Sequence, residues 1–374
     1  MQFRDLRKQY QTLKPKMDAA VTKVMTDGNF ISGAQVRELE QRLAEYAGTK
    51  YCISCANGTD ALELAERVYG IGDGDAVFVP DFTFFSTAET VAELGATPIF
   101  VDVDAETFNI CPKALEEAVR RVTALSGLRP KAIVAVDLFG LPADYSEIER
   151  IAKENDLLLI EDGAQGFGGR IGARRACSFG DIATTSFFPA KPLGCYGDGG
   201  AVFTNDDDAA AMLRSLCVHG KSELDKYDNL RLGMNSRLDT IQAAVLAVKM
   251  SAFTEYELES VNRAAAMYTA RLADRVATPV IPANFYSSWA QYTIKLADRR
   301  QRDAVQSTLR EKDIPTMVYY PKCMHQQGAF AALPYAGSCP NAERLCDTVL
   351  SLPMHPYLDE QTIDLICASL IDCL

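Results

Sequence analysis

The sequence predicts an α/β protein built on a largely parallel β-sheet that helices cover on both faces. Seven short apolar or β-branched runs between residues 51 and 204 indicate buried strands. Amphipathic stretches with helical spacing separate most of these runs, and alternating strands and helices are typical of parallel sheets. A long helical pattern at 240–276 then leads into a smaller C-terminal unit.

The first part of the chain is predicted to be helical. One helix begins at about residue 15 and ends at Asp27-Gly28-Asn29, and an amphipathic helix follows at 36–46. The predicted strands are 51–55, 76–79, 97–101, 131–136, 157–161, 182–187 and 201–204. The helical stretches between them are 60–68, 86–94, 112–123 and 145–155. The last strand resembles the return of a hairpin.

The segment after the last strand contains another helix, which ends near residue 219. A polar loop at 221–231 follows, and we expect it at an edge or an interface. Further strands are predicted near 292–296 and 316–320. We place the domain boundary near residue 250, so that 1–250 form the large domain and 251–374 the small one.

The composition of the 374 residues is that of a globular protein, with 48% hydrophobic and 24% charged residues. The net charge of −12 argues against a nucleic-acid partner and against binding to an anionic membrane surface. No apolar stretch is long enough to span a bilayer, and no apolar run follows the N-terminal residues. We therefore expect a cytoplasmic protein with no membrane partner.

The eleven cysteines are scattered, which favours reduced thiols over a disulfide framework. Cys52 and Cys55 form a C-x-x-C pair, but strand alternation places them on opposite faces of the strand at 51–55. The chain has no second C-x-x-C and only three histidines. We predict no metal site.

A single lysine, Lys191, stands where the strand at 182–187 runs into a loop rich in proline and glycine. Ligands bind at the carboxyl ends of strands in an open α/β sheet. A lysine held there among apolar neighbours can become a nucleophilic amine that forms a Schiff base. Taken alone, this stretch fits a surface lysine in a glycine-rich loop better.

Other predicted strand ends carry polar or aromatic residues. Gly58 and Thr59 lead directly into a helix, whose exposed amides and hydroxyl suit a phosphate, although a simple helix cap explains them as well. Phe84 follows the next strand and could stack on a ring, or pack in the core. Asp162 follows four apolar residues, so its carboxylate needs a partner unless it only caps a helix.

These features together match the requirements of pyridoxal 5′-phosphate (PLP). A phosphate cup, an aromatic ring, a buried aspartate and a Schiff-base lysine all lie at strand ends of one predicted sheet. An aspartate beside the pyridine nitrogen keeps that nitrogen protonated and strengthens the ring as an electron sink. The sequence therefore predicts a PLP site at this edge of the sheet.

Five motifs carry a resemblance to a known family. They are N-G-T-D-A-L at 57–62, E-D-x-A-Q at 161–165, S-F-F-P-x-K at 186–191, G-D-G-G at 197–200 and N-S-R-L-D at 235–239. With these motifs the chain resembles the DegT/StrS-type PLP-dependent nucleotide-sugar aminotransferases over essentially its whole length. The resemblance implies the type I (aspartate aminotransferase-like) PLP fold, a mostly parallel seven-stranded sheet, and a homodimer with active sites at the subunit interface.

The resemblance also implies roles for individual residues. Lys191 is expected to bind PLP covalently and to move protons, and Asp162 to pair with the pyridine nitrogen. The expected cofactor contacts are Gly58, Thr59, Phe84, Asp162, Gln165, Ser186, Lys191 and, from the partner subunit, Asn235. The expected substrate contacts are Arg237, Tyr319, Tyr320 and His325.

The implied reaction is transfer of an amino group from an amino-acid donor, glutamate, to a nucleotide-linked keto-sugar. Within the family the chain is most similar to the aminotransferases of UDP-2-acetamido-2-deoxy-3-oxo-glucuronate in bacterial polysaccharide pathways, including lipopolysaccharide. Two positions depart from the pattern of many relatives, because Asp137 and Tyr319 each stand where those relatives have histidine near the sugar.

Three alternatives stay open. PLP-dependent sugar dehydratases share the fold, but they carry histidine at the position of Lys191. A nicotinamide enzyme is suggested by the glycines at 166–172, whose spacing does not match G-x-G-x-x-G. A non-catalytic binding or regulatory protein could also keep the PLP fold.

Overall fold

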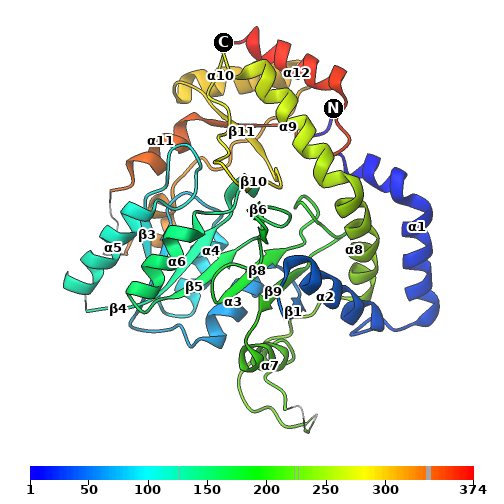
Figure 1. Cartoon of the computed structure of the whole chain (residues 1–374), viewed down its shortest axis with the longest axis vertical. Coiled ribbons are helices and arrows are strands. Elements are labelled where there is room, and N and C mark those ends of the chain that lie inside the picture. The colour runs from blue at the N-terminus through cyan, green and yellow to red at the C-terminus, as the bar shows by residue number, and fades with distance from the viewer. Residues whose placement is uncertain (126, 223, 226, 334–337) are drawn as a thin grey trace.

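The computed structural model describes residues 1–374 except 126, 223, 226 and 334–337. Its central sheet has seven strands in the order β1-β9-β8-β5-β4-β2-β3 (Figure 1). The strands are β1 Tyr51–Cys55, β2 Asp75–Pro80, β3 Thr97–Val101, β4 Arg129–Val136, β5 Leu158–Asp162, β8 Ile182–Ser186 and β9 Gly200–Thr204. Strands β3, β2, β4, β5 and β8 pair in parallel, whereas β9 runs antiparallel to both of its neighbours. The seven strands predicted between residues 51 and 204 and the hairpin-like return are confirmed.

Helices cover both faces of this sheet, because each strand buries side chains on both sides. One face packs against α3 Gly58–Val68, α4 Ser86–Glu93 and α7 Asp207–Leu216. The other face packs against α1 Leu6–Asp27, α2 Ala34–Ala47, α5 Pro112–Leu125, α6 Tyr145–Glu154 and α8 Thr240–Ala252. Cys55 belongs to the first core and Cys52 to the second, which confirms that they lie on opposite faces.

The C-terminal part of the chain has its own core above the sheet (Figure 1). A π-helical turn, Phe253–Glu257, continues α8 into α9 Leu258–Leu272, so the predicted long helical stretch is present. The remaining helices and strands of this part are α10 Arg299–Glu311, α11 Pro340–Thr348, α12 Glu360–Ile371, β11 Tyr292–Lys295 and β12 Val349–Leu352. Strand β11 pairs antiparallel with β12.

Two predictions about secondary structure were wrong. The segment 316–320 is not a strand and makes only the bridge between Met317 and Ser351. Pro315 and Pro321 flank it, and proline cannot donate a hydrogen bond to a sheet. Helix α1 begins at Leu6 rather than near residue 15, and Pro15 lies inside it on the solvent side. The Asp5 side chain caps this earlier start.

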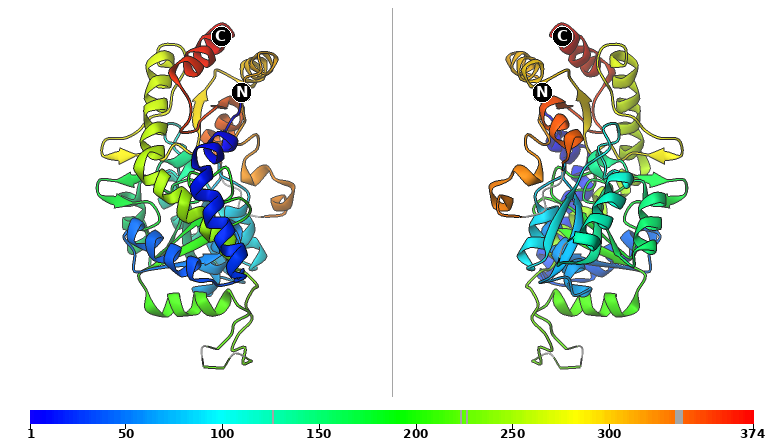
Figure 2. Two further views of the ribbon diagram at one scale, coloured as in Figure 1. Left: turned by 90° about the vertical axis from the view of Figure 1, so that its right-hand side faces the viewer. Right: turned by 90° about the vertical axis from the view of Figure 1, so that its left-hand side faces the viewer.

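The smaller features surround the sheet. A short three-stranded sheet consists of β6 Arg170–Ile171, β7 Arg174–Arg175 and β10 Phe285–Tyr286. The segment after α7 projects from the end of the molecule opposite the C-terminal helices, as both side views show (Figure 2). Within the described part of the chain, no helix has the length and apolar character needed to cross a bilayer.

Candidate active site

The predicted lysine and aspartate meet at the carboxyl end of the parallel strands. Asp162 is the last residue of β5, and Lys191 lies in the turn that follows the adjacent strand β8. Burial lowers the pKa of Lys191, and the Asp162 carboxylate opposes that effect. Burial likewise raises the pKa of Asp162, against the charge of Lys191. Each group is therefore the electrostatic partner of the other in an otherwise desolvated place.

Asp162 is held by hydrogen bonds within the chain. Its Oδ2 accepts a hydrogen bond from Thr87 Oγ1 at 2.9 Å, and its Oδ1 accepts one from the Ala164 amide at 3.2 Å. The Thr87 hydroxyl is in turn 3.0 Å from that of Thr83, one helical turn earlier in the chain. The carboxylate is thus fixed in orientation, and the threonines that fix it were not predicted. Their spacing of four residues in a hydroxyl-rich stretch was the signal available.

The turn that carries Lys191 is tightly bonded. The Lys191 amide donates to Phe188 O at 2.8 Å, and the Cys195 amide donates to Phe187 O at 2.7 Å. Gly194 packs so closely that a Cβ there would lie 2.5 Å from Phe188 O, so only glycine fits. The strand end and its turn therefore form one rigid support for the lysine.

The N-terminus of helix α3 lies beside this turn, and the Asn57 side chain caps it by accepting a hydrogen bond from the Asp60 amide at 2.8 Å. Helix α3 begins at Gly58, and a Cβ on that residue would lie 2.6 Å from Cβ of Ser186 at the end of β8. The Thr59 hydroxyl is 2.8 Å from that of Ser86, the first residue of α4. The glycine is required because Ser186 packs against it. The first amides of α3 and the hydroxyls of Thr59, Ser86 and Ser186 are donors of the kind that bind a phosphate. Ser86 was not predicted.

The aromatic part of the site joins the large sheet to the C-terminal part. The Phe84 side chain is 52% exposed, and its ring centroid lies 6.3 Å from that of Tyr320. Gln165 donates through Nε2 to the Tyr320 hydroxyl at 3.1 Å and accepts from the Phe139 amide at 2.8 Å. The structure therefore brings Phe84, Gln165 and Tyr320 together, and an exposed ring face remains on Phe84.

His325 is oriented by a residue that was not predicted. Its Nδ1 lies 2.6 Å from Oδ2 of buried Asp81, and its amide donates to Oδ1 of the same carboxylate at 2.9 Å. Asp81 directly follows strand β2, so it belongs to the same edge of the sheet as Asp162. Tyr319 instead packs edge-on against Phe3, with ring centroids 6.2 Å apart.

Asn235 and Arg237 lie on the segment between α7 and α8. Ser236 stands between them, and its Oγ accepts a hydrogen bond from the Ala56 amide at 3.0 Å, two residues before the start of α3. Asn235 is exposed and forms a bridge with Val218, while Arg237 lines a separate open hollow of about 1030 Å³ with His219 and Arg231. In the described ranges, no hydrogen bond or ion pair joins either residue to the lysine, the aspartate or the phosphate position.

Asp137 is not in a position to touch a substrate, contrary to the expectation that it lies near the sugar. It is completely buried, and its Oδ1 accepts hydrogen bonds from Tyr145 Oη at 2.8 Å and the Ala143 amide at 3.1 Å. Burial raises the pKa of Asp137 to about 7, and it also raises the pKa of neighbouring Glu161. The two buried carboxyl groups are coupled, because a charge on one disfavours a charge on the other. The pair is part of the interior behind the site.

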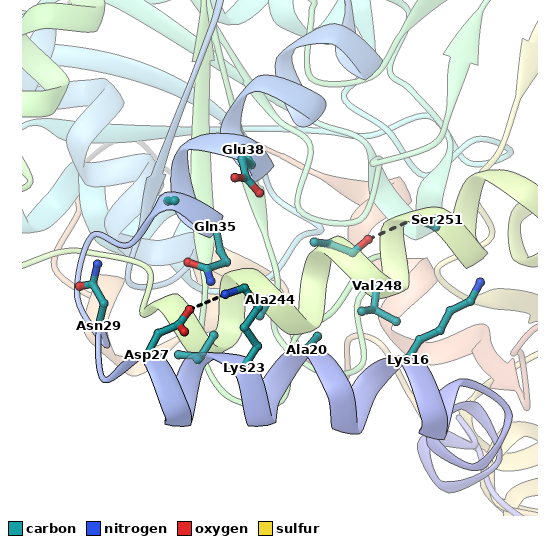
Figure 3. A pocket seen from close by; sticks show the side chains of 13 residues that line it. Lys16, Ala20, Lys23, Asp27, Asn29, Gln35, Glu38, Ala244, Val248 and Ser251 are labelled. Atoms are coloured by element: carbon teal, nitrogen blue, oxygen red, sulfur yellow. Dashed lines mark hydrogen bonds and ion pairs between the residues drawn. The ribbon is translucent and has the colours of Figure 1, made fainter.

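A further groove, of about 670 Å³, lies between α1, α2 and α8 (Figure 3). Its walls carry Lys16, Glu38 and the ion pair between Lys23 and Asp27. None of the predicted site residues lines this groove, so it is separate from the candidate active site.

The fold is that of aminotransferases with known structures. A crystal structure of a DegT DnrJ EryC1 StrS aminotransferase from Brucella abortus matches with a TM-score of 0.95 and 47% identity, covering 99% of this chain and 98% of that one. The chain belongs to the DegT/DnrJ/EryC1/StrS aminotransferase family, which it matches over residues 11–371.

Two curated relatives cover almost the whole chain. The UDP-2-acetamido-2-deoxy-3-oxo-D-glucuronate aminotransferase of Pseudomonas aeruginosa is 44% identical over 99% of both chains. A protein of Geobacillus stearothermophilus named pleiotropic regulatory protein is 43% identical over 96% of this chain and 94% of its own length.

The cofactor of this family is PLP, and the residues present fit it. A solved neighbour from Bacillus subtilis, 28% identical with a TM-score of 0.87, contains the amino form of the cofactor, PMP. In the present chain, the first amides of α3, the hydroxyl of Ser186 and the buried Asp162 provide donors for a phosphate and a partner for a protonated ring nitrogen. The chain is therefore a PLP-dependent aminotransferase.

Proposed function

We propose that this enzyme transfers an amino group from glutamate to a nucleotide-linked 3-keto-sugar, of the UDP-3-keto-N-acetylhexosaminuronate type or a close analogue. The observation that carries the proposal is the pairing of Lys191 with buried Asp162 beside the N-terminus of α3. The name of the Pseudomonas aeruginosa relative supports the 3-oxo-sugar class.

Each part of the site has a proposed role in holding PLP. Gly58, Thr59 and Ser186 would hold its phosphate, since amides and hydroxyls converge there. Phe84 would lie against the ring, with Gln165 at its hydroxyl edge. Asp162 would keep a proton on the ring nitrogen. When bound, PLP supplies an electron sink for the carbon that loses its proton.

The proposed role of Lys191 depends on an amine that is neutral when it acts. Burial lowers the pKa of this amine, so less free energy is needed to remove its proton. Nζ of Lys191 would first bind the cofactor and, once the amino donor displaces it, carry a proton to and from the reacting carbon. The rigid turn keeps Nζ on one side of the site during both half-reactions.

The substrate side is proposed to involve residues from two subunits. Tyr320 and His325 are held in the same chain by Gln165 and Asp81, and Tyr319 adjoins them. Asn235 and Arg237 would serve the site of the partner subunit in a homodimer, where a guanidinium can bind an anionic sugar nucleotide. Exposed apolar side chains support an interface at this segment, namely Leu224, Tyr227, Leu230 and Leu232.

The setting of the reaction and the domain division are also proposals. The eleven cysteines are unpaired and mostly buried, which fits a reducing cytoplasm. We place the enzyme there, in amino-sugar synthesis for bacterial surface polysaccharide such as lipopolysaccharide. The separate core around α9 and β11 supports a small domain at 251–374 beside a large one at 1–250.

The test is spectroscopic. We expect the purified protein to gain a visible absorption band on incubation with PLP, and Lys191→Ala to lose it. Addition of glutamate should bleach the band, and a UDP-3-keto-sugar should restore it. No band in the wild type contradicts the proposed role of Lys191. A band that glutamate leaves unchanged contradicts the proposed donor, and a band that no amino acid bleaches favours a non-catalytic protein.

A further inference from the structure

The residues before α1 run between the Lys191 turn and the C-terminal part of the chain. Phe3 O accepts a hydrogen bond from the Met354 amide at 3.1 Å, and the Phe3 ring packs edge-on against Tyr319. Asp5 then caps the start of α1 through the Lys8 amide. Arg4 lies between these two anchored residues, so its backbone is held on both sides.

The Arg4 side chain points at the backbone of the lysine turn. Its Nη2 donates to the carbonyl oxygen of Lys191 at 2.7 Å and to that of Pro192 at 3.2 Å. Within the described part of the chain, no other group donates a hydrogen bond to either of these two carbonyl oxygens. Carbonyls in a buried turn need partners, and a charged donor binds more strongly than a neutral one.

The charge of Arg4 lowers the pKa of several basic side chains around this turn. Burial lowers the pKa of Arg4 to about 10, opposed by Glu257, so the guanidinium stays charged at neutral pH. That charge adds to burial in lowering the pKa of Lys191, and it also contributes to lowering the pKa of Lys249 to about 7 and of His355 to about 4. A fixed cation here disfavours a second cation on Lys191.

We propose that Arg4 is a positioning residue for Lys191, which holds the turn by its carbonyls and sets the direction in which the lysine side chain enters the site. The inference rests on the proposed function of Lys191. It goes further, because it gives the N-terminal segment a part in cofactor capture. Arg4 touches the backbone of the lysine rather than any reacting atom, so it acts through Lys191.

The variants are Arg4→Gln, which removes the charge and the fork of donors, and Arg4→Lys, which keeps the charge. Arg7→Gln is the matched control, since Arg7 is exposed and lies three residues further along the same segment. Thermal melting first establishes that each variant folds. Two quantities are then measured in cofactor-free protein: the pH profile of Lys191 acetylation by trace acetic anhydride, read by mass spectrometry, and the rate of PLP capture.

For Arg4→Gln we expect the Lys191 profile to move to higher pH, with acetylation and PLP capture at pH 7.5 slower by about three- to tenfold. Arg4→Lys should show a smaller change of about two- to threefold, and Arg7→Gln none. A wild-type profile and capture rate in Arg4→Gln overturn the inference. If Arg4→Gln does not fold, wild-type behaviour of Arg4→Lys overturns it instead.

Borohydride reduction separates this inference from the proposed function. Reduction of the PLP-loaded wild type should leave the cofactor covalently attached to the peptide that contains Lys191. Attachment to another lysine contradicts the proposed function and the inference with it. Attachment to Lys191 in both the wild type and Arg4→Gln, at equal capture rates, leaves the proposed function intact and contradicts only the role of Arg4.

Discussion

The turn at Lys191 and the segment between α7 and α8 contrast within one chain. Backbone hydrogen bonds, close glycine packing and Arg4 hold the turn. The other segment carries Leu224 at 99% and Leu232 at 90% exposure, and its Arg237 faces an open hollow. The Lys191 turn is therefore fixed by contacts within one chain. Asn235 and Arg237, on the other segment, are proposed to serve the site of a partner subunit.

The largest effect is expected beside the Lys191 turn, from the substitution Asp162→Asn. Loss of the charge that would keep the ring nitrogen protonated should lower kcat by about 10²- to 10⁴-fold. Thr87→Val keeps the carboxylate and removes one hydrogen bond to it, so it should lower kcat by about tenfold at most. Single-turnover rates with glutamate measure both. Equal effects of the two substitutions would contradict a separate role for the Asp162 charge.

A smaller effect, limited to the sugar substrate, is expected from the segment between α7 and α8. Arg237→Ala should lower kcat/KM for the sugar nucleotide by about 10- to 100-fold, because it removes a charge-assisted contact. The half-reaction with glutamate should be unchanged. Both half-reactions are followed by the visible band, and an equal loss in the two would contradict a role limited to the sugar.

Mixing two weakened variants tests whether the sites are shared. Lys191→Ala and Arg237→Ala chains, mixed under conditions that exchange subunits, should recover activity above that of either alone. A mixed dimer would contain one site with both original residues. If the activity of the mixture stays at the average of the two variants, Arg237 belongs to the active site of its own subunit.

The exposed leucines sharpen the contrast further. Leu232→Asp should weaken dimer formation by about 30-fold, since a charge would enter an apolar interface. Leu365→Asp is the control, because Leu365 is also exposed but lies on α12 in the C-terminal part. Sedimentation measures the dissociation constant of each. Equal dissociation constants for the two variants would contradict the placement of Leu232 in the dimer interface.

The last prediction concerns folding stability and the buried pair behind the site. The folded chain holds the proton of Asp137 up to about pH 7, whereas an unfolded aspartate loses it near pH 4. Folding stability should therefore fall between these values as pH rises, by up to about 1.4 kcal/mol per pH unit. Asp137→Asn cannot titrate and should flatten this slope. Urea unfolding at several pH values measures the folding stability of both proteins. An equal pH dependence in the wild type and Asp137→Asn would contradict the raised pKa of Asp137.

Much of the fold and the centre of the site could be predicted from the sequence, for a physical reason. A buried strand shows as a short apolar run, and parallel strands end at one edge of the sheet. The residues directly after such runs, including Gly58, Asp162 and Lys191, were therefore expected to meet. The segment 316–320 was wrongly predicted as a strand, because its apolar residues fit a strand while the prolines on either side prevent one.

Only the tertiary structure decided which distant residues support that centre. Arg4 meets a carbonyl 187 residues away in the chain, Thr87 meets Asp162 and Asp81 meets His325, and no periodic pattern marks such pairs. Asp137 directly follows β4 and Asp162 ends the neighbouring β5, yet the Asp137 side chain turns inward to Tyr145. A side chain's direction at a strand end depends on its packing neighbours. The sequence thus determined where the chemistry lies, and packing determined which polar groups face it.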